Sequence, residues 1–143
     1  MKLFDVNILI NAHRQENEGH SFYNKWLTNL LQGKETFLYC EWILSSFIRI
    51  VTHPKIYRTP TPLPQALLFV DLVRSQPNAI GIMPGARHWN CFSQLCSSTN
   101  SSGNLIPDAY LAALAIEADA EWISADRDFS LFEPALKWQL LRP

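Results

Sequence analysis

The sequence contains no apolar run that approaches the roughly 20 residues a membrane-spanning helix needs. Asp5 and Asn7 interrupt its first apolar stretch, so the N-terminus does not resemble a secretory signal. The cysteines Cys40, Cys91 and Cys96 are odd in number and form no Cys-x-x-Cys pair, which argues against a disulfide framework and against a zinc knuckle. We therefore expect a protein without a membrane segment, located in a reducing cytoplasm.

The chain also lacks internal repeats, low-complexity tracts and any linker long enough to divide it. A length of 143 residues is usual for one domain, and 48% hydrophobic residues are enough for a substantial core. The charged fraction of 17% is too low for a disordered chain. These features predict a single domain over residues 1–143.

Acidic and basic residues are unevenly distributed, although the formal net charge is only −1. Between Trp42 and Pro107 the only acid is Asp71, and the two ends hold the other twelve of the thirteen acids. The basic residues of the same segment are Arg49, Lys55, Arg58, Arg74 and Arg87. An acidic centre beside a mildly basic segment suits a metal enzyme acting on a polyanion, but a chance imbalance on a solvated surface explains the distribution equally well.

Short apolar runs alternate with segments of helical periodicity along the chain. The predicted strands are residues 1–4, 36–40, 79–83, 121–125 and 138–141. The predicted helices are one starting at Asn7 as its N-cap, then 20–31, 41–51, one along 67–73, 86–96 and 108–118. Strands that alternate with helices predict an α/β fold with a parallel sheet covered by helices on both faces.

Four aspartates stand at the ends of these predicted elements. Asp5 ends the first strand, Asp126 and Asp128 follow the fourth, and Asp108 opens a helix directly behind Pro107. Ligands of parallel sheets gather at the carboxyl ends of the strands, so these side chains are expected to share a crevice. Close carboxylates cannot all stay ionised without divalent cations, and Mg²⁺ and Mn²⁺ prefer carboxylate oxygen. The pattern predicts a metal-dependent phosphodiester or phosphoryl enzyme.

Two small polar residues, Asn7 and Ser124, are placed to orient a carboxylate or a bound water. The positive end of the helix dipole is expected to favour the ionised form of Asp108. Purely structural roles are the alternative for each acid taken alone. Asp108 would then be an ordinary helix-terminus acid, while Asp126 or Asp128 would cap a turn.

Three segments resemble the signature blocks of PIN-domain nucleases. They are Phe4–Ile10 (FDVNILI), Asn104–Ala113 (NLIPDAYLAA) and Ser124–Phe129 (SADRDF). The segment Phe47–Pro54 (FIRIVTHP) narrows the resemblance to the VapC toxins of type II toxin–antitoxin modules. The resemblance runs nearly end to end, with the blocks in the same order and spacing.

The resemblance implies a compact three-layer α/β/α domain with a central, mostly parallel sheet. It also implies a Mg²⁺- or Mn²⁺-dependent endoribonuclease that hydrolyses RNA with a metal-activated water. By motif position, Asp5, Asp108 and Asp126 match the metal-binding catalytic acids, with Asp128 as an accessory ligand. A cognate VapB-type antitoxin would block the site, and the proline-rich segment 54–64 with its flanking helices is a candidate surface for that partner or for a homodimer.

One position departs from the family pattern. Many PIN domains carry a glutamate where this chain has Ser46. Glu41 lies five residues earlier, about 140° around a helix, so it cannot be assumed to replace the missing acid. A PIN-fold module that binds RNA or protein through a weakened or inactive metal site is therefore the alternative to an active nuclease.

The remaining candidates have weaker signals. Arg49 and Arg87 are candidates for gripping RNA phosphates, and an ordinary surface role explains either equally well. We interpret His88 as a helix-surface residue. Trp42 and Trp89 are expected in the core or at an interface rather than as platforms for base stacking.

Overall fold

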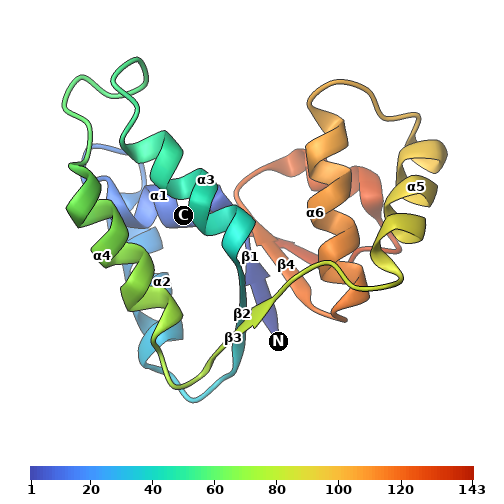
Figure 1. Ribbon diagram of the computed structural model, residues 1–143, viewed down its shortest axis with the longest axis horizontal. Helices are drawn as coiled ribbons and strands as arrows, with labels where there is room; N and C mark the ends of the chain where they lie inside the picture. Colours follow the sequence, from blue (N-terminus) through green and yellow to red (C-terminus); the bar gives the residue numbers. More distant parts are fainter.

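The computed structural model describes residues 1–143, with one five-stranded sheet at its centre (Figure 1). The strands are β1 (Lys2–Phe4), β2 (Phe37–Cys40), β3 (Ala79–Ile82), β4 (Glu121–Ser124) and β5 (Trp138–Leu140). Their spatial order is β3-β2-β1-β4-β5, and every neighbouring pair is parallel. The predicted parallel sheet is confirmed, and each predicted strand agrees with the structure to within one residue at either end.

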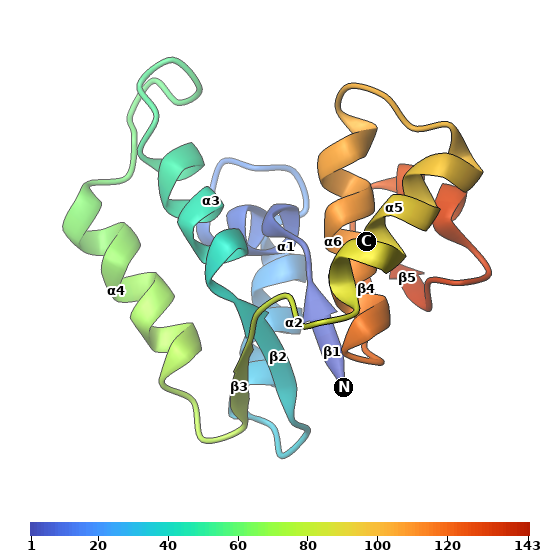
Figure 2. The ribbon, with the colours of Figure 1, turned by 45° about the vertical axis from the view of Figure 1, so that its right-hand side comes forward.

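Helices cover both faces of this sheet. They are α1 (Val6–His13), α2 (His20–Gln32), α3 (Glu41–Val51), α4 (Leu63–Arg74), α5 (His88–Thr99), α6 (Leu105–Glu117) and the 3₁₀ helix η1 (Arg127–Phe132). Figures 1 and 2 show α1–α4 on one side of the strands and α5 and α6 on the other, which confirms the three-layer α/β/α fold. None of these helices combines the length and the apolar character that crossing a bilayer requires.

The central strands are buried on both faces, as parallel sheets usually are. Leu3, Phe37, Trp122 and Ile123 are completely inaccessible to solvent. The edge strand β3 is more open, with Ile80 48% exposed. Continuous apolar runs, rather than alternating patterns, therefore marked the central strands in the sequence.

Several helix starts differ from the sequence predictions. Helix α4 begins at Leu63, ahead of the predicted 67–73, and α5 begins at His88 rather than at residue 86. Asp5, not Asn7, is the N-cap of α1, because the chain turns from β1 directly into the helix. Asn7 then lies inside the first turn with its side chain free for other contacts. Helix α6 begins at Leu105 rather than Asp108, because Pro107 is tolerated throughout a first turn, where N–H groups have no helical partner. The 3₁₀ helix after β4 was not predicted.

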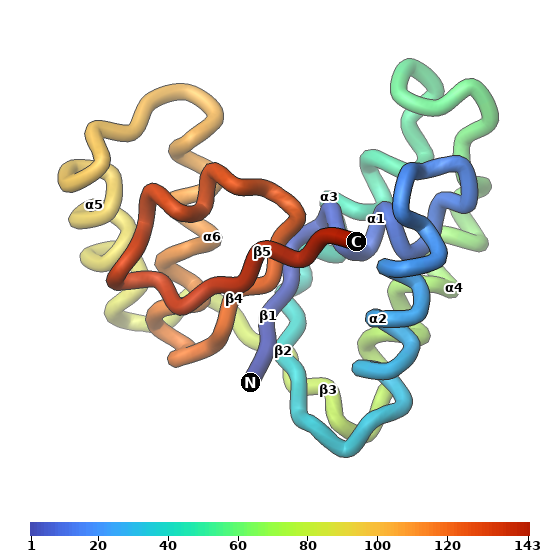
Figure 3. The backbone as a smooth tube through the Cα atoms, turned by 180° about the vertical axis from the view of Figure 1, so that it is seen from behind, coloured from blue at the N-terminus to red at the C-terminus, as the bar shows by residue number.

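The sheet has its topological switch point between β1 and β4. These strands pair with Phe4 opposite Ile123, and Figure 3 shows β1 lying between β2 and β4. The chain leaves β1 towards α1 on one face, whereas it reaches β4 from α6 on the other. Ligands of open parallel sheets bind at such a point, outside the carboxyl ends of the strands.

Candidate active site

The switch point brings the sequence-predicted aspartates to one end of the sheet. Asp5 follows β1 directly, and its backbone N–H donates to the carbonyl oxygen of Ile123 on β4 at 2.8 Å. Asp126 lies two residues beyond the end of β4, and Asp108 lies in the first turn of α6. Asp128 is exposed within η1.

A small hydrogen-bond network fixes the carboxylate of Asp5. Its Oδ2 accepts a bond from Ser124 Oγ at 2.7 Å and another from Asn7 Nδ2 at 3.0 Å. Asn7 Nδ2 also lies 3.2 Å from Ser124 Oγ, while its Oδ1 accepts from the backbone N–H of Ala125 at 3.2 Å. Asn7 and Ser124 thus hold this carboxylate in one orientation, the contact that the sequence had suggested for them.

Two of the carboxyl groups are held less acidic than usual. Burial raises the pKa of Asp5 from 3.8 to about 6, although the Ser124 bond lowers it, and the charge of Asp126 raises it further. Burial also raises the pKa of Asp108 to about 6, and the negative charges of Asp5, Asp126 and Asp128 act in the same direction. Burial and like charges therefore raise the pKa of Asp108, in the direction opposite to the effect expected from the helix dipole.

Asp126 also serves a structural purpose. Its Oδ1 accepts from the backbone N–H of Asp128 at 2.9 Å and so caps η1. Its own N–H donates to Ser124 Oγ at 3.0 Å. The turn-capping role considered as an alternative is thus realised, and the half-buried carboxylate still acts on both Asp5 and Asp108.

The donor chemistry of this cluster suits a hard divalent cation, since four carboxylates that repel one another would be relieved by positive charge. The carboxylate oxygens do not, however, converge on a single point. No three His, Cys, Asp or Glu side chains lie close enough together to surround an ion. Binding a cation at this site would therefore require the side chains to draw together.

Comparison with known proteins identifies the family of this chain. The PIN domain family model matches residues 2–133. The VapC ribonuclease Mb2897 of Mycobacterium bovis is 40% identical over 139 residues, covering 97% of this chain and 94% of the relative. The chain belongs to the VapC branch of the PIN-domain family. Ribonuclease VapC25 of Mycobacterium tuberculosis is 38% identical over 132 residues, covering 92% of this chain and 93% of the relative.

Solved structures share the PIN fold at low sequence identity. One is VapBC2 from Rickettsia felis, bound to a DNA fragment from its promoter. It superposes with a TM-score of 0.70 and 18% identity over 96% of both chains. This likeness supports the architecture and the strand order.

Many PIN domains carry a glutamate at the position of Ser46, and Glu41 on the same helix does not replace this acid. Ser46 is half-buried on α3. Glu41 is exposed at the start of the same helix and forms an ion pair with Arg74 of α4 at 3.5 Å. Its carboxylate thus contacts α4, and its charge is not among those that act on Asp5 or Asp108.

The two arginines proposed for phosphate binding lie in different places. Arg49 is exposed on α3, which packs against α1. The backbone N–H of Arg87 donates to Glu117 at 2.9 Å, at the end of α6 opposite Asp108. Glu117 lies nine residues after Asp108 on α6, about 13 Å along the axis, so the structure does not bring Arg87 to the aspartates.

His88 differs from its prediction, and one of the two locations expected for the tryptophans is excluded. His88 is only 2% exposed, and its Nε2 lies 2.9 Å from the carbonyl oxygen of Tyr110, so the surface assignment is wrong. Its ring packs edge-on against Tyr110 because α5 lies against α6. Trp42 and Trp89 are 65% and 69% exposed, which excludes the core for both, while an interface role stays a prediction.

Proposed function

We propose that this protein is the toxin of a type II toxin–antitoxin module and a Mg²⁺- or Mn²⁺-dependent endoribonuclease. The observation that carries the proposal is the set of four aspartates whose charges act on one another at the switch point. The chain's relatives, at about 40% identity, are named as VapC ribonucleases, which supports RNA as the substrate.

In this proposal Asp5, Asp108 and Asp126 hold the cation, with Asp128 at its edge. A divalent cation bound there supplies an activated water and polarises the scissile phosphate. Ser124 and Asn7 keep the carboxylate of Asp5 fixed, so little rearrangement of that ligand is needed.

Several residues act around this centre. Burial of Asp5 keeps bulk water from competing for its oxygens. Arg49 is exposed and forms no ion pair, so it is available to contact an RNA phosphate. No histidine or lysine contacts the Asp5 carboxylate, so the chain offers no general base of that kind beside it.

A PIN-fold module that binds RNA or protein without cleaving is the second candidate. It is favoured by Ser46 at the position of a frequent acid and by carboxylates that do not converge. The two candidates differ in one measurable property, which is the hydrolysis of RNA when divalent cations are added.

The test is cleavage of a labelled RNA in chelator, in Mg²⁺ and in Mn²⁺. We expect cleavage only with cations, and its loss in Asp5→Asn, Asp108→Asn and Asp126→Asn. Asp71→Asn is the matched control, because Asp71 is an exposed aspartate on α4. Equal cleavage by Asp5→Asn and the native chain would refute the site, and RNA binding without cleavage in any condition would support the binding module.

A VapB-type antitoxin is the proposed partner, since solved structures of this fold include VapB–VapC assemblies. Exposed leucines support a protein-binding surface on α4 beside the proline-rich loop. They are Leu63, Leu67, Leu68 and Leu72, between 44% and 71% exposed. We propose that this α4 face binds the antitoxin or a second copy of the chain in a homodimer.

A cytoplasmic location is part of the same proposal. All three cysteines are free thiols, and Cys40 is buried. Free thiols persist in a reducing compartment, where the RNA substrate is also found.

A further inference from the structure

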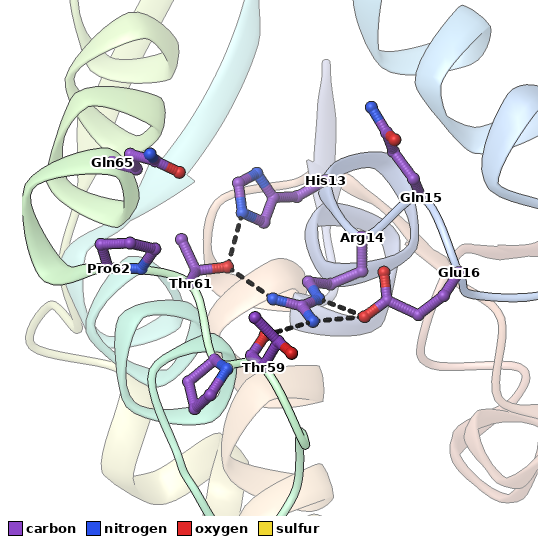
Figure 4. A pocket seen from close by; sticks show the side chains of 9 residues that line it. His13, Arg14, Gln15, Glu16, Thr59, Thr61, Pro62 and Gln65 are labelled. Atoms are coloured by element: carbon purple, nitrogen blue, oxygen red, sulfur yellow. Dashed lines mark hydrogen bonds and ion pairs between the residues drawn. The ribbon is translucent and has the colours of Figure 1, made fainter.

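A polar pocket of about 460 Å³ lies at the C-terminal end of α1, where the loop between α3 and α4 folds back over that helix (Figure 4). The loop covers residues 52–62. His13, Arg14 and Glu16 line the pocket from the α1 side, and Thr59 and Thr61 line it from the loop. No local pattern in the sequence predicts this arrangement.

Arg14 fastens the loop to α1. Its Nη1 donates to Thr61 Oγ1 at 2.9 Å, and its Nη2 donates to the carbonyl oxygen of Thr59 at 2.8 Å. The guanidinium also lies 4.0 Å from the ring centroid of Tyr57 and forms an ion pair with Glu16. The side chain of Arg14 is only 11% exposed, so its charge and its hydrogen-bond donors are satisfied by other groups of the protein.

His13 strengthens the same attachment. Its Nε2 lies 3.0 Å from Thr61 Oγ1, and its ring packs edge-on against Phe47 of α3 and Phe69 of α4. Thr61 is buried and its backbone N–H donates to Val51 at 2.8 Å. The base of the loop is therefore fixed from both α1 and α3.

The outer part of the loop differs from its base, because its charged side chains form no ion pairs. Lys55 and Arg58 are exposed and take part in no ion pair. No acidic residue occurs from Trp42 to Pro62. The fixed loop thus presents two uncompensated positive charges to solvent, which a polyanion would neutralise.

Helix α1 fixes the separation between Asp5 and the base of the loop. Helix α1 begins directly after Asp5 and ends at His13, so its eight residues span about 12 Å. Asp5 lies at one end of this helix and the Arg14 attachment at the other. A single rigid helix therefore links the carboxylates to the basic loop.

We propose that the loop 52–62 contacts the RNA backbone through Lys55 and Arg58, and that Arg14 is the positioning residue that holds the loop. This inference rests on the proposed function, because it takes RNA as the substrate of the aspartate site. The loop contributes affinity and register, while the aspartates beyond the other end of α1 act on the phosphodiester.

The experiment measures binding of a short single-stranded RNA of mixed sequence to the Asp5→Asn chain in chelator, over a range of salt concentrations. The affinity for a single strand falls with salt, and removing two phosphate contacts makes the slope of log affinity against log salt less negative by about 1.4. We expect that change in Lys55→Ala/Arg58→Ala, with an affinity loss of about tenfold or more at low salt. The control is Lys25→Ala/Lys34→Ala, which removes two exposed, unpaired charges elsewhere.

Arg14 is tested through its coupling to the loop. Arg14→Lys keeps the charge but loses the guanidinium fork, and we expect weaker RNA binding in the otherwise native loop. The same substitution is expected to have no further effect on RNA binding once Lys55 and Arg58 are alanine, because Arg14 acts through them. A purely structural role would give the same loss in both backgrounds and would overturn the assignment of Arg14.

The outcomes separate this inference from the proposed function. Equal affinities and salt slopes for the loop and control variants would overturn the loop contact, even in a chain that cleaves RNA with Mg²⁺. A loss of antitoxin binding without a loss of RNA binding would assign the loop to a protein interface and overturn the inference. RNA binding that depends on the loop in a chain that never cleaves would support the inference while the proposed nuclease activity fails.

Discussion

Ser124 Oγ donates a 2.7 Å hydrogen bond to Oδ2 of Asp5, across 119 positions of the sequence. The same hydroxyl accepts from the N–H of Asp126 at 3.0 Å and lies 3.2 Å from Nδ2 of Asn7. One completely buried hydroxyl therefore supports two of the candidate catalytic aspartates at once. It uses its single donor and both of its acceptor positions to do so.

Replacing Ser124 with alanine should therefore disturb the site without removing an acid. Asp5 loses the bond that lowers its pKa, so this pKa should move above its present value of about 6. Because a cation binds the ionised carboxylate, the pH at which Mn²⁺ binding is half-maximal should rise. Titration calorimetry at several pH values measures this shift. Ser130→Ala, at an exposed site in η1, serves as the control, and an unshifted pH dependence in Ser124→Ala would contradict the role given to the hydroxyl.

The raised pKa of Asp5 predicts how the stability of the metal-free protein depends on pH. The folded value of about 6 exceeds the unfolded value of 3.8, so the folded state binds this proton more tightly. Its contribution to stability is present below pH 3.8 and is lost as the pH rises through about 6. Asp5→Asn removes this titration, so its stability relative to the native chain should increase by up to roughly 3 kcal/mol across that window.

Urea unfolding of both chains in chelator, at pH values from acid to neutral, checks this prediction. Asp71→Asn is the control, since Asp71 is exposed on α4. Saturating Mn²⁺ should reverse the trend for the native chain only, because a bound ion favours the ionised Asp5. A stability difference between Asp5→Asn and the native chain that stays constant with pH would show that Asp5 is not held protonated in the fold.

The strands and the acidic positions could be predicted from the sequence because both depend on local patterns. Buried parallel strands appear as short apolar runs, and Asp5 and Asp126 follow two of them. Which strands become neighbours depends on contacts between distant residues, so the sequence indicated that Ser124 could orient a carboxylate but not that the carboxylate is that of Asp5. The raised pKa of Asp108 could not be predicted for the same reason, since its burial and the neighbouring charges arise only in the folded chain.

The sequence also contains signals for the burial of His88 and for the basic loop, which the predictions missed. His88, Phe92 and Leu95 follow the spacing of one helix face, which predicts that His88 is turned inward. The stretch without acids around Lys55 and Arg58 marked a basic loop, but not its attachment to α1. That attachment joins residues 47 positions apart, which no local pattern indicates.

Glu117 provides a test far from the aspartates. Its carboxylate accepts from the N–H of Gly85 at 2.7 Å and from that of Arg87 at 2.9 Å, ahead of α5. The bond from Gly85 lowers the pKa of Glu117 below its usual 4.5. Glu117→Gln can accept only one of these bonds through its amide oxygen and should be less stable by about 1 kcal/mol at neutral pH.

The lowered pKa of Glu117 also predicts how this difference in stability changes with pH. A lowered pKa contributes stability above pH 4.5 that is lost as the pH falls through the folded value. The stability gap between Glu117→Gln and the native chain should therefore narrow in acid, as measured by thermal unfolding. RNA cleavage should be unchanged, because Asp108 lies about 13 Å away along α6. A large loss of cleavage at unchanged stability would place Glu117 or Arg87 in the site after all.

The exposed leucines of α4 give the last prediction. Leu68 is 71% exposed, so Leu68→Glu should change the free energy of unfolding by no more than about 0.5 kcal/mol. If the α4 face binds the antitoxin or a second copy, a buried carboxylate at its centre should weaken that association at least tenfold, or about 1.4 kcal/mol. Leu131→Glu is the matched control, since Leu131 is 50% exposed in η1, next to β4 and far from α4 in sequence. Light scattering of the toxin alone and co-purification with the antitoxin distinguish the two partners. If Leu68→Glu and Leu131→Glu associate as the native chain does, the α4 face is not an interface.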